Sequence, residues 1–232
     1  MLDTLISEPF LGFSRKALNF FSKLKNKKCN NKKWFDANRD VFEVEIKLPM
    51  RSLLDTLTPE LKKFDERIVI SYKSIFRINR DIRFKRDKTP YKSHYGASLT
   101  YDKIKTPEVP QFYFHISSDE FLFASGQYSS DTAMIKKMRK RIFQDKELFL
   151  SIINEKSFVN NFGQIKGTKL KNLPFEYRRM NTEGITEFLK MKQFYVFKTY
   201  SPETALSGGL TDIILENIKI TGEFNKFLYD SI

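Results

Sequence analysis

The spacing of the apolar residues changes close to Phe64, and this change constrains the fold more than any other feature. Before it, apolar side chains recur at intervals of three, four and seven residues, the spacing of an amphipathic helix. The stripe begins with Phe10, Phe13, Ala17, Phe20, Phe21 and Leu24. After it, apolar and polar residues alternate over Arg67–Ile78, which predicts a strand. We therefore expect a helical part over about residues 1–65 and a sheet-rich part over about 66–200.

Three helices are expected in the N-terminal part. The first ends near Leu24, and Asn30 and Asn31 give the start signal for the second. Pro49 lacks an N–H and disfavours helical geometry at the residue before it, so the second helix should kink or restart there. A further helix then covers about Arg51–Phe64. The basic stretch Lys23–Lys33 falls at the junction of the first two helices.

The rest of the chain combines strands and helices. Strands are predicted over His94–Tyr101, Gln111–Ser117, Lys166–Pro174 and Gln193–Ser201, with a hairpin turn at Ser117–Glu120. Helices are predicted from Asp131 to about Phe149, near Glu183–Met191, and over Leu210–Leu228 with a break near Gly222. Helices at both ends around a mainly antiparallel sheet make the expected fold class α+β. The C-terminal helices should occupy about residues 205–230.

Length and composition predict one folded domain over residues 1–232, because 41% of the residues are hydrophobic and 15% are aromatic. The single cysteine, Cys29, excludes an internal disulfide and fits a reducing compartment. No apolar run approaches the roughly 20 residues of a membrane helix. The N-terminus carries Asp3 and Glu8 where a secretory signal would carry Lys or Arg. We expect a cytoplasmic protein that does not insert into membranes.

The positive charge lies in two segments. Arg15–Lys33 contains eight Lys or Arg and no acid, and Arg77–Lys92 contains seven against Asp81 and Asp87. Their net charges, +8 and +5, equal the formal +13 of the whole chain. A surface that is basic in patches concentrates phosphates, nucleic acids or anionic head groups around it.

The second segment reads RINRDIRFKRDKTPYK and has the composition of an anion site, because planar Arg side chains hold phosphate or carboxylate through paired hydrogen bonds. Its candidate ligand-binding residues are Arg77, Arg80, Asp81, Arg83, Lys88, Tyr91 and Lys92. If the segment is a strand, Arg77, Asp81 and Arg83 share one face and Arg80 lies on the other. Asp81 would then pair with Arg77 or Arg83. The structural alternative is an Arg and Asp network that ties neighbouring elements together.

The sequence contains two histidines, His94 and His115, and either is a candidate general acid or base near neutral pH. His94 is favoured because it lies two residues beyond the motif, and Tyr91 is a further candidate for proton transfer. Two histidines without closely spaced acids argue against a zinc site, and we expect neither a metal nor a cofactor. Gly208 and Gly209 precede a predicted helix, but such a pair is more often part of a loop or cap.

The motif also resembles a known family. The spacing of Arg77, Arg80, Asp81, Arg83 and Phe84, followed by Lys88, Thr89, Pro90, Tyr91 and Lys92, resembles that of the uncharacterised family catalogued as domain of unknown function 2461. NNKKWFDANRD at Asn30–Asp40 and GTKLKNLP at Gly167–Pro174 resemble further landmarks of that family, so the resemblance spans nearly the full chain. It implies a single α+β domain with no assigned activity.

Three functions remain open. The favoured one is binding of a phosphorylated or otherwise anionic small molecule, because the motif mixes Asp, Thr and Tyr with its cations. The first alternative is a nucleic-acid-binding module in which exposed aromatics, such as Tyr91, Tyr95 and Tyr113, stack on bases. The second is a structural interaction protein whose arginines are paired internally. From the sequence we assign no reaction and no oligomeric state.

Overall fold

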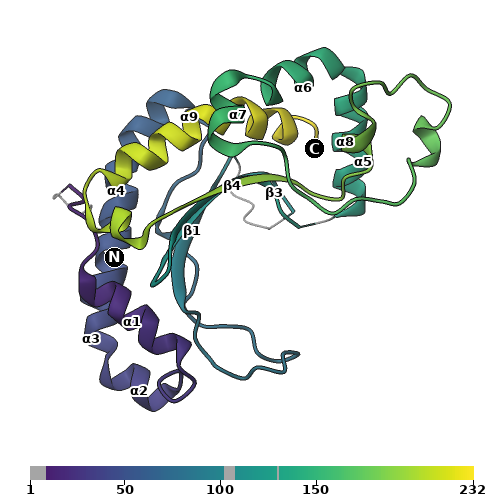
Figure 1. Ribbon diagram of the computed structural model, residues 1–232. Helices are drawn as coiled ribbons and strands as arrows, with labels where there is room; N and C mark the ends of the chain where they lie inside the picture. The colour runs from purple at the N-terminus through teal and green to yellow at the C-terminus, as the bar shows by residue number, and fades with distance from the viewer. Residues whose placement is uncertain (1–8, 102–107, 130) are drawn as a thin grey trace. The chain divides into compact units, whose positions relative to one another are not determined.

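The structure is a computed structural model that describes residues 9–101, 108–129 and 131–232 (Figure 1). Asp3 and Glu8, which we used to argue against a secretory signal, lie outside the described residues. Contacts divide the chain into two compact units. The first comprises Met1–Leu99, Tyr113–Phe123 and Thr199–Glu216, and the second comprises Thr100–Phe112, Ala124–Lys198 and Asn217–Ile232. The single domain over residues 1–232 stays a prediction.

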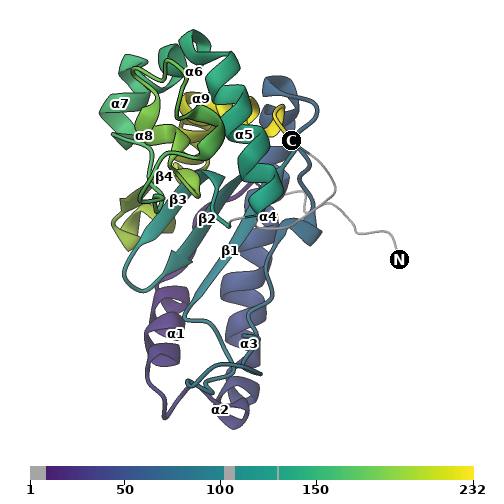
Figure 2. The same cartoon turned by 90° about the vertical axis from the view of Figure 1, so that its right-hand side faces the viewer.

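The fold class is α+β, as predicted. Four strands form one antiparallel sheet in the order β1-β2-β3-β4, and β1 to β3 lie side by side in Figure 2. The strands are β1 (His94–Thr100), β2 (Gln111–Ser117), β3 (Phe121–Gln127) and β4 (Phe194–Tyr200). The predicted hairpin turn is confirmed, because the Ser117 N–H donates to the Glu120 carbonyl at 2.9 Å. Phe112, Phe114 and Ile116 are buried on one face of β2, whereas Tyr113 and His115 on the other face are half-buried.

Helices of the first unit follow the predicted apolar stripe closely. They are α1 (Arg15–Lys25), α2 (Lys32–Ala37), α3 (Arg39–Phe42) and α4 (Leu48–Phe64). Asn31 caps α2, as its position predicted, by accepting a hydrogen bond from the Trp34 N–H at 3.0 Å. A π-helical turn, η1 (Glu43–Lys47), leads into α4 with Pro49 in its first turn. Leu48 keeps helical geometry (φ −63°, ψ −49°), so the restart predicted at Pro49 is wrong and the chain stays helical through it.

The strand predicted over Arg67–Ile78 is wrong. Tyr72–Ser74 form a 3-10 turn, η2, which Ser71 and Ser74 close by exchanging side-chain and backbone hydrogen bonds. This local capping competes with strand pairing, and over residues 67–78 the structure has isolated bridge residues at Val69 and Ile75 in place of a strand, with Ile75 paired to Ala97. The segment that follows extends away from the end of β1 as an irregular loop (Figure 1).

Most helices of the second unit lie between β3 and β4. They are α5 (Thr132–Gln144), α6 (Lys146–Ile153), α7 (Lys156–Phe162) and α8 (Thr186–Leu189). The single helix predicted to run to Phe149 is therefore two helices that meet at Asp145. The strand predicted over Lys166–Pro174 is also wrong, since this segment forms only isolated bridges from Lys166 to Tyr195 and from Lys169 to Met191.

The last helix, α9 (Leu210–Tyr229), is continuous, so the break predicted at Gly222 is wrong. A glycine inside a helix costs about 1 kcal/mol relative to alanine. The apolar face of α9 outweighs that cost because Ile214, Ile218, Phe224, Phe227 and Leu228 are all buried. None of the described helices is both long and apolar enough to span a membrane.

Candidate functional site

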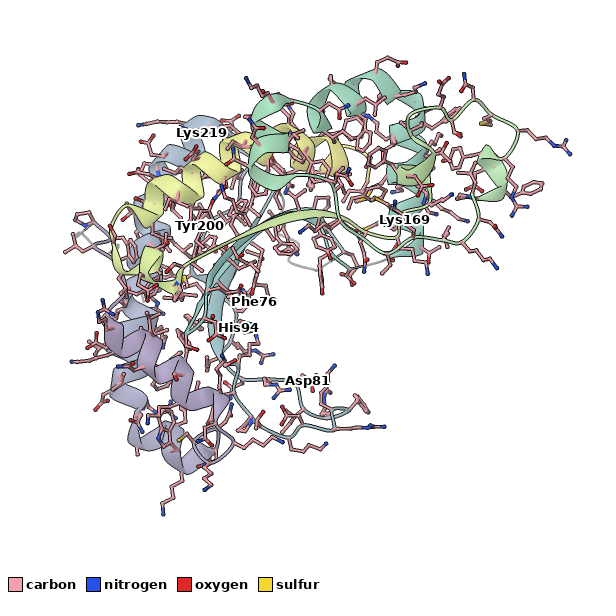
Figure 3. All side chains as sticks on the ribbon, in the orientation of Figure 1. Phe76, Asp81, His94, Lys169, Tyr200 and Lys219 are labelled. Atoms are coloured by element: carbon pink, nitrogen blue, oxygen red, sulfur yellow. The ribbon has the colours of Figure 1, made fainter. Side chains whose placement is uncertain are left out.

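The basic motif folds back on itself between η2 and β1. The Arg80 N–H donates to the Pro90 carbonyl and the Lys92 N–H donates to the Ile78 carbonyl, each at 2.8 Å. A bridge between Asn79 and Tyr91 lies between these two bonds. The motif is thus an irregular hairpin rather than the strand considered from the sequence. Figure 3 shows Phe76 and His94 together at its base and Asp81 farther out along it.

At the tip of this hairpin, Asp81 and Arg83 form a two-point ion pair. Arg83 Nη2 lies 2.6 Å from Asp81 Oδ2, and Arg83 Nε lies 3.0 Å from Asp81 Oδ1. Hydrogen bonds from Arg83 lower the pKa of Asp81 to about 2. Lys88 Nζ donates to the carbonyls of Ile82 and Arg83 at 3.0 and 3.3 Å. The pairing of Asp81 with Arg83 was one of the two predicted, and all three charged side chains are exposed.

Closer to the base, Arg80 is held by the loop that follows it. Its Nη1 lies 2.6 Å from Asp87 Oδ2 and 3.2 Å from the Thr89 carbonyl, and it also bonds to the Thr89 hydroxyl. The hydrogen bond from Arg80 is the main reason that the pKa of Asp87 falls to about 2, and bonds from Thr89 add to the effect. This arrangement fixes the guanidinium at the root of the hairpin.

Tyr91 lies in the core. Its ring stacks on Phe35 at 4.1 Å between centroids, and only 7% of the residue is exposed. Burial, followed by the charge of Asp36, raises the pKa of its hydroxyl. Tyr95 is also buried, at 6% exposure, and burial raises its pKa to about 12. The nucleic-acid alternative treated both tyrosines as exposed stacking platforms, and that expectation is wrong.

One cleft in the first unit brings the two basic segments together. We call it the basic cleft; its volume is about 290 Å³, and its charged and titratable lining comprises Lys25, Lys27, Arg80, Asp87, Tyr91, Lys92 and His94. Four of these side chains are cations and one is a carboxylate. Lys25 is paired with Asp119. The Lys27 ammonium forms no hydrogen bond or ion pair with the residues that the structure describes.

A second cleft of about 160 Å³ shares Lys92 and His94 with the first. We call it the aromatic cleft, and it is lined by Phe76, Arg77, Lys92, His94, Tyr95, Gly96 and Tyr113. Lys92 Nζ donates to the Arg77 carbonyl at 2.8 Å and lies 5.4 Å from the centroid of the Phe76 ring. Burial, followed by the charge of Arg77, lowers the pKa of Lys92. Among the described residues, none forms a hydrogen bond or ion pair with the Arg77 guanidinium.

The two histidines lie in contact beside the aromatic cleft. Their ring centroids are 4.7 Å apart, and His115 Nδ1 lies 3.0 Å from the Tyr113 hydroxyl. His115 Nε2 lies 3.5 Å from a Glu120 carboxylate oxygen, which favours the proton on Nε2, so the Tyr113 hydroxyl donates to Nδ1. Burial lowers the pKa of each histidine to about 4, and for His94 the charges of His115 and Lys92 add to this effect. Both imidazoles are therefore neutral at pH 7.

The structure thus divides the predicted ligand residues into three places. Arg80, Tyr91 and Lys92 line the basic cleft, and Arg77 and Lys92 line the aromatic cleft. Asp81, Arg83 and Lys88 lie outside the linings of both clefts, so contact of these three with a ligand stays a prediction. In the part of the chain that the structure describes, no group of three or more metal-ligating side chains comes together.

Sequence reasoning did not single out Lys25, Lys27, Asp87 or Phe76 as site residues. The signal for the two lysines was the basic stretch Lys23–Lys33, which we placed at a helix junction and not against the motif. No local pattern shows that this junction and the motif meet, because 61 residues separate the Asn30 and Tyr91 that join them.

Comparison with known proteins places this architecture in a family. The family model described as "Conserved hypothetical protein (DUF2461)" matches residues 16–227, which include the linings of both clefts and, apart from Arg15, both basic segments. None of the curated proteins matches the chain. Because the match covers most of the 232 residues, the chain belongs to the DUF2461 family of conserved hypothetical proteins.

Proposed function

We propose that this protein binds a phosphorylated or otherwise anionic small molecule in the basic cleft. The observation that carries the proposal is the convergence of Lys25, Lys27, Arg80 and Lys92, from two distant segments, on one cleft with a single carboxylate, Asp87. Like charges brought this close repel one another, and a bound anion removes that repulsion. The net excess of cations is what a phosphate group requires.

The donors of the cleft suit a compact anion. Lys27 offers an ammonium with no protein partner among the described residues, and Arg80 uses only Nη1 in its bonds to Asp87 and Thr89. The remaining guanidinium N–H groups of Arg80 are held in a fixed direction by those bonds, so little entropy is lost when they bind a ligand. Burial of Tyr91 and Tyr95 removes two of the three expected stacking residues, which favours a small molecule over nucleic acid.

Isothermal titration calorimetry at low salt tests this proposal, with pyrophosphate and ribose 5-phosphate as probes. We expect both to bind the parent protein and to raise its melting temperature by mass action. Lys27→Gln should weaken binding of both, whereas Lys28→Gln, one residue away and outside the cleft lining, should not. Arg83→Ala tests whether the hairpin tip also contacts the ligand. Absence of binding by the parent, or equal loss in the Lys27 and Lys28 variants, would remove the basis of the proposal.

A further inference from the structure

The two clefts share a wall. Lys92 and His94 line both, so the two clefts are adjacent, and a ligand long enough to occupy both would contact these two residues. The two ends of such a ligand meet different chemistry. The basic cleft offers cations, whereas the aromatic cleft offers ring surfaces and a neutral imidazole.

Ring surfaces dominate the aromatic cleft. Phe76 and Tyr113 meet edge to face, with centroids 5.9 Å apart and planes at 62°. Gly96 contributes no side chain to the lining. A larger residue does not fit at this position, because its Cβ would lie 2.3 Å from the Phe114 carbonyl oxygen and 2.7 Å from His115 Cβ. A flat group is the shape that packs against such walls, and an aromatic group adds stacking to the burial of apolar surface.

His94 adds a requirement for hydrogen bonding. Its neutral imidazole has one donor and one acceptor, and neither is bonded to any residue in the described part of the chain. The contact with His115 is through the ring. A ligand without polar edge atoms would leave these two groups unsatisfied in a largely buried place, which is unfavourable. The flat group should therefore carry both a donor and an acceptor on its edge.

We propose that the aromatic cleft holds the base of a mononucleotide whose phosphate lies in the basic cleft. This inference rests on the proposed function and narrows its ligand from an anionic small molecule to a nucleotide. A nucleobase is flat, has two faces for stacking, and carries donors and acceptors on its edge. A sugar phosphate satisfies the cations but brings no flat face to the aromatic cleft and no edge with both a donor and an acceptor to His94. The unpaired Arg77 guanidinium at the same cleft adds a donor for a base carbonyl or a second phosphate.

Calorimetry with AMP, GMP, CMP and UMP beside ribose 5-phosphate tests this inference. At least one nucleotide should bind about tenfold or more tighter than ribose 5-phosphate, the gain that stacking of one base provides. Phe76→Leu should remove most of this preference and reduce ribose 5-phosphate binding much less than nucleotide binding. Phe84→Leu is the matched control, since Phe84 is 94% exposed on the hairpin and lies outside both cleft linings. His94→Phe, which keeps a ring against His115, should also reduce the preference.

The outcomes separate this inference from the proposed function. Ribose 5-phosphate binding that depends on Lys27, without any nucleotide preference, would overturn the inference and leave the proposed function standing. A preference that survives both Phe76→Leu and His94→Phe would place the base elsewhere and would also overturn it. A hexaribonucleotide without a terminal phosphate that binds tighter than every mononucleotide would show that the ligand is a single-stranded nucleic acid, contrary to the inference. Failure of every phosphorylated probe to bind would overturn both proposals.

Discussion

The buried side-chain amide of Asn30 forms hydrogen bonds with both backbone polar groups of Tyr91. Asn30 Oδ1 accepts from the Tyr91 N–H at 3.0 Å, and Asn30 Nδ2 donates to the Tyr91 carbonyl at 2.9 Å. The same Nδ2 also donates to the Leu24 carbonyl at 2.7 Å, at the end of α1. One side chain therefore joins the helix junction that carries Lys25 and Lys27 to the strand-like arm that carries Lys92. It holds the two walls of the basic cleft together.

Asn30→Ala should lower the free energy of unfolding by about 2 to 4 kcal/mol, because it leaves three buried backbone groups without these partners. It should also weaken binding of pyrophosphate, since the cleft walls lose their connection. Urea denaturation and calorimetry measure the two effects. Asn26→Ala is the control: Asn26 is exposed in the same turn, and within the described part of the chain its side chain bonds only to the Lys28 N–H. Equal stability losses in the two variants would contradict the role assigned to Asn30.

Asp87→Asn should tighten binding of pyrophosphate. Asp87 is the carboxylate among the charged residues that line the basic cleft. Its Oδ2 lies 2.6 Å from Arg80 Nη1, so its negative charge partly cancels the positive charge of Arg80. Removing one unit charge a few Å from an anion changes the binding free energy by about 1 kcal/mol in water, or roughly fivefold in affinity. The gain should shrink as salt is added.

Stability should change little in the Asp87→Asn variant, because the ion pair is partly exposed and such pairs contribute little. Asp81→Asn is the matched control, since Asp81 makes the same kind of pair with Arg83 outside the cleft linings. We expect it to leave pyrophosphate affinity unchanged. Weaker binding after Asp87→Asn would contradict the prediction. It would mean that the positioning of the Arg80 guanidinium by Asp87 favours binding more than the negative charge of Asp87 disfavours it.

The histidine pair should make stability depend on pH. In the folded protein the pKa of each is about 4, whereas an unfolded histidine titrates near 6.5. The unfolded state therefore binds more protons below about pH 6.5, so the free energy of unfolding falls from there to about pH 4. Asp81 and Asp87 have pKa values of about 2, so their protonation lowers the free energy of unfolding only at more acidic pH. We expect a loss on the order of 2 to 4 kcal/mol between pH 7 and pH 4.5.

Denaturation with urea at a series of pH values measures this loss. His94→Gln removes one titrating group without adding charge and should make the dependence clearly shallower. His115→Gln is less suitable alone, because it also removes the partner of the Tyr113 hydroxyl. A parent protein whose stability is constant between pH 6.5 and 4.5 would show that the two imidazoles are not buried in their neutral form.

Much of the fold follows from local patterns in the sequence. Helices α1 and α4, the Asn31 cap and the β2–β3 hairpin depend on side-chain spacing and on turn residues, which are local properties. The errors came where another interaction outweighed the pattern. The hydroxyls of Ser71 and Ser74 close a 3-10 turn inside an alternating segment, and the buried face of α9 carries the helix through Gly222.

The site could be predicted less well than the fold. The charge of the Arg77–Lys92 segment and the pairing of Asp81 with Arg83 were readable from the sequence. Burial of Tyr91 was not, because it depends on Phe35, 56 positions earlier in the numbering and on another element. The clefts themselves form from segments that are distant in sequence, and no periodicity or motif specifies which lysine faces which arginine.

Gln127→Met should raise the free energy of unfolding by about 1 to 3 kcal/mol. Gln127 is fully buried at the end of β3, and neither its Oε1 nor its Nε2 is bonded to a residue that the structure describes. A buried amide without partners is unfavourable, and methionine fills a similar volume without polar hydrogen-bonding groups to satisfy. Gln193→Met is the matched control: Gln193 Oε1 accepts hydrogen bonds from the Thr168 N–H and hydroxyl at 3.0 and 3.1 Å, so its replacement should lower stability by about 1 kcal/mol. Urea denaturation should show a higher free energy of unfolding for Gln127→Met and a lower one for Gln193→Met. A loss of stability in Gln127→Met would contradict the prediction.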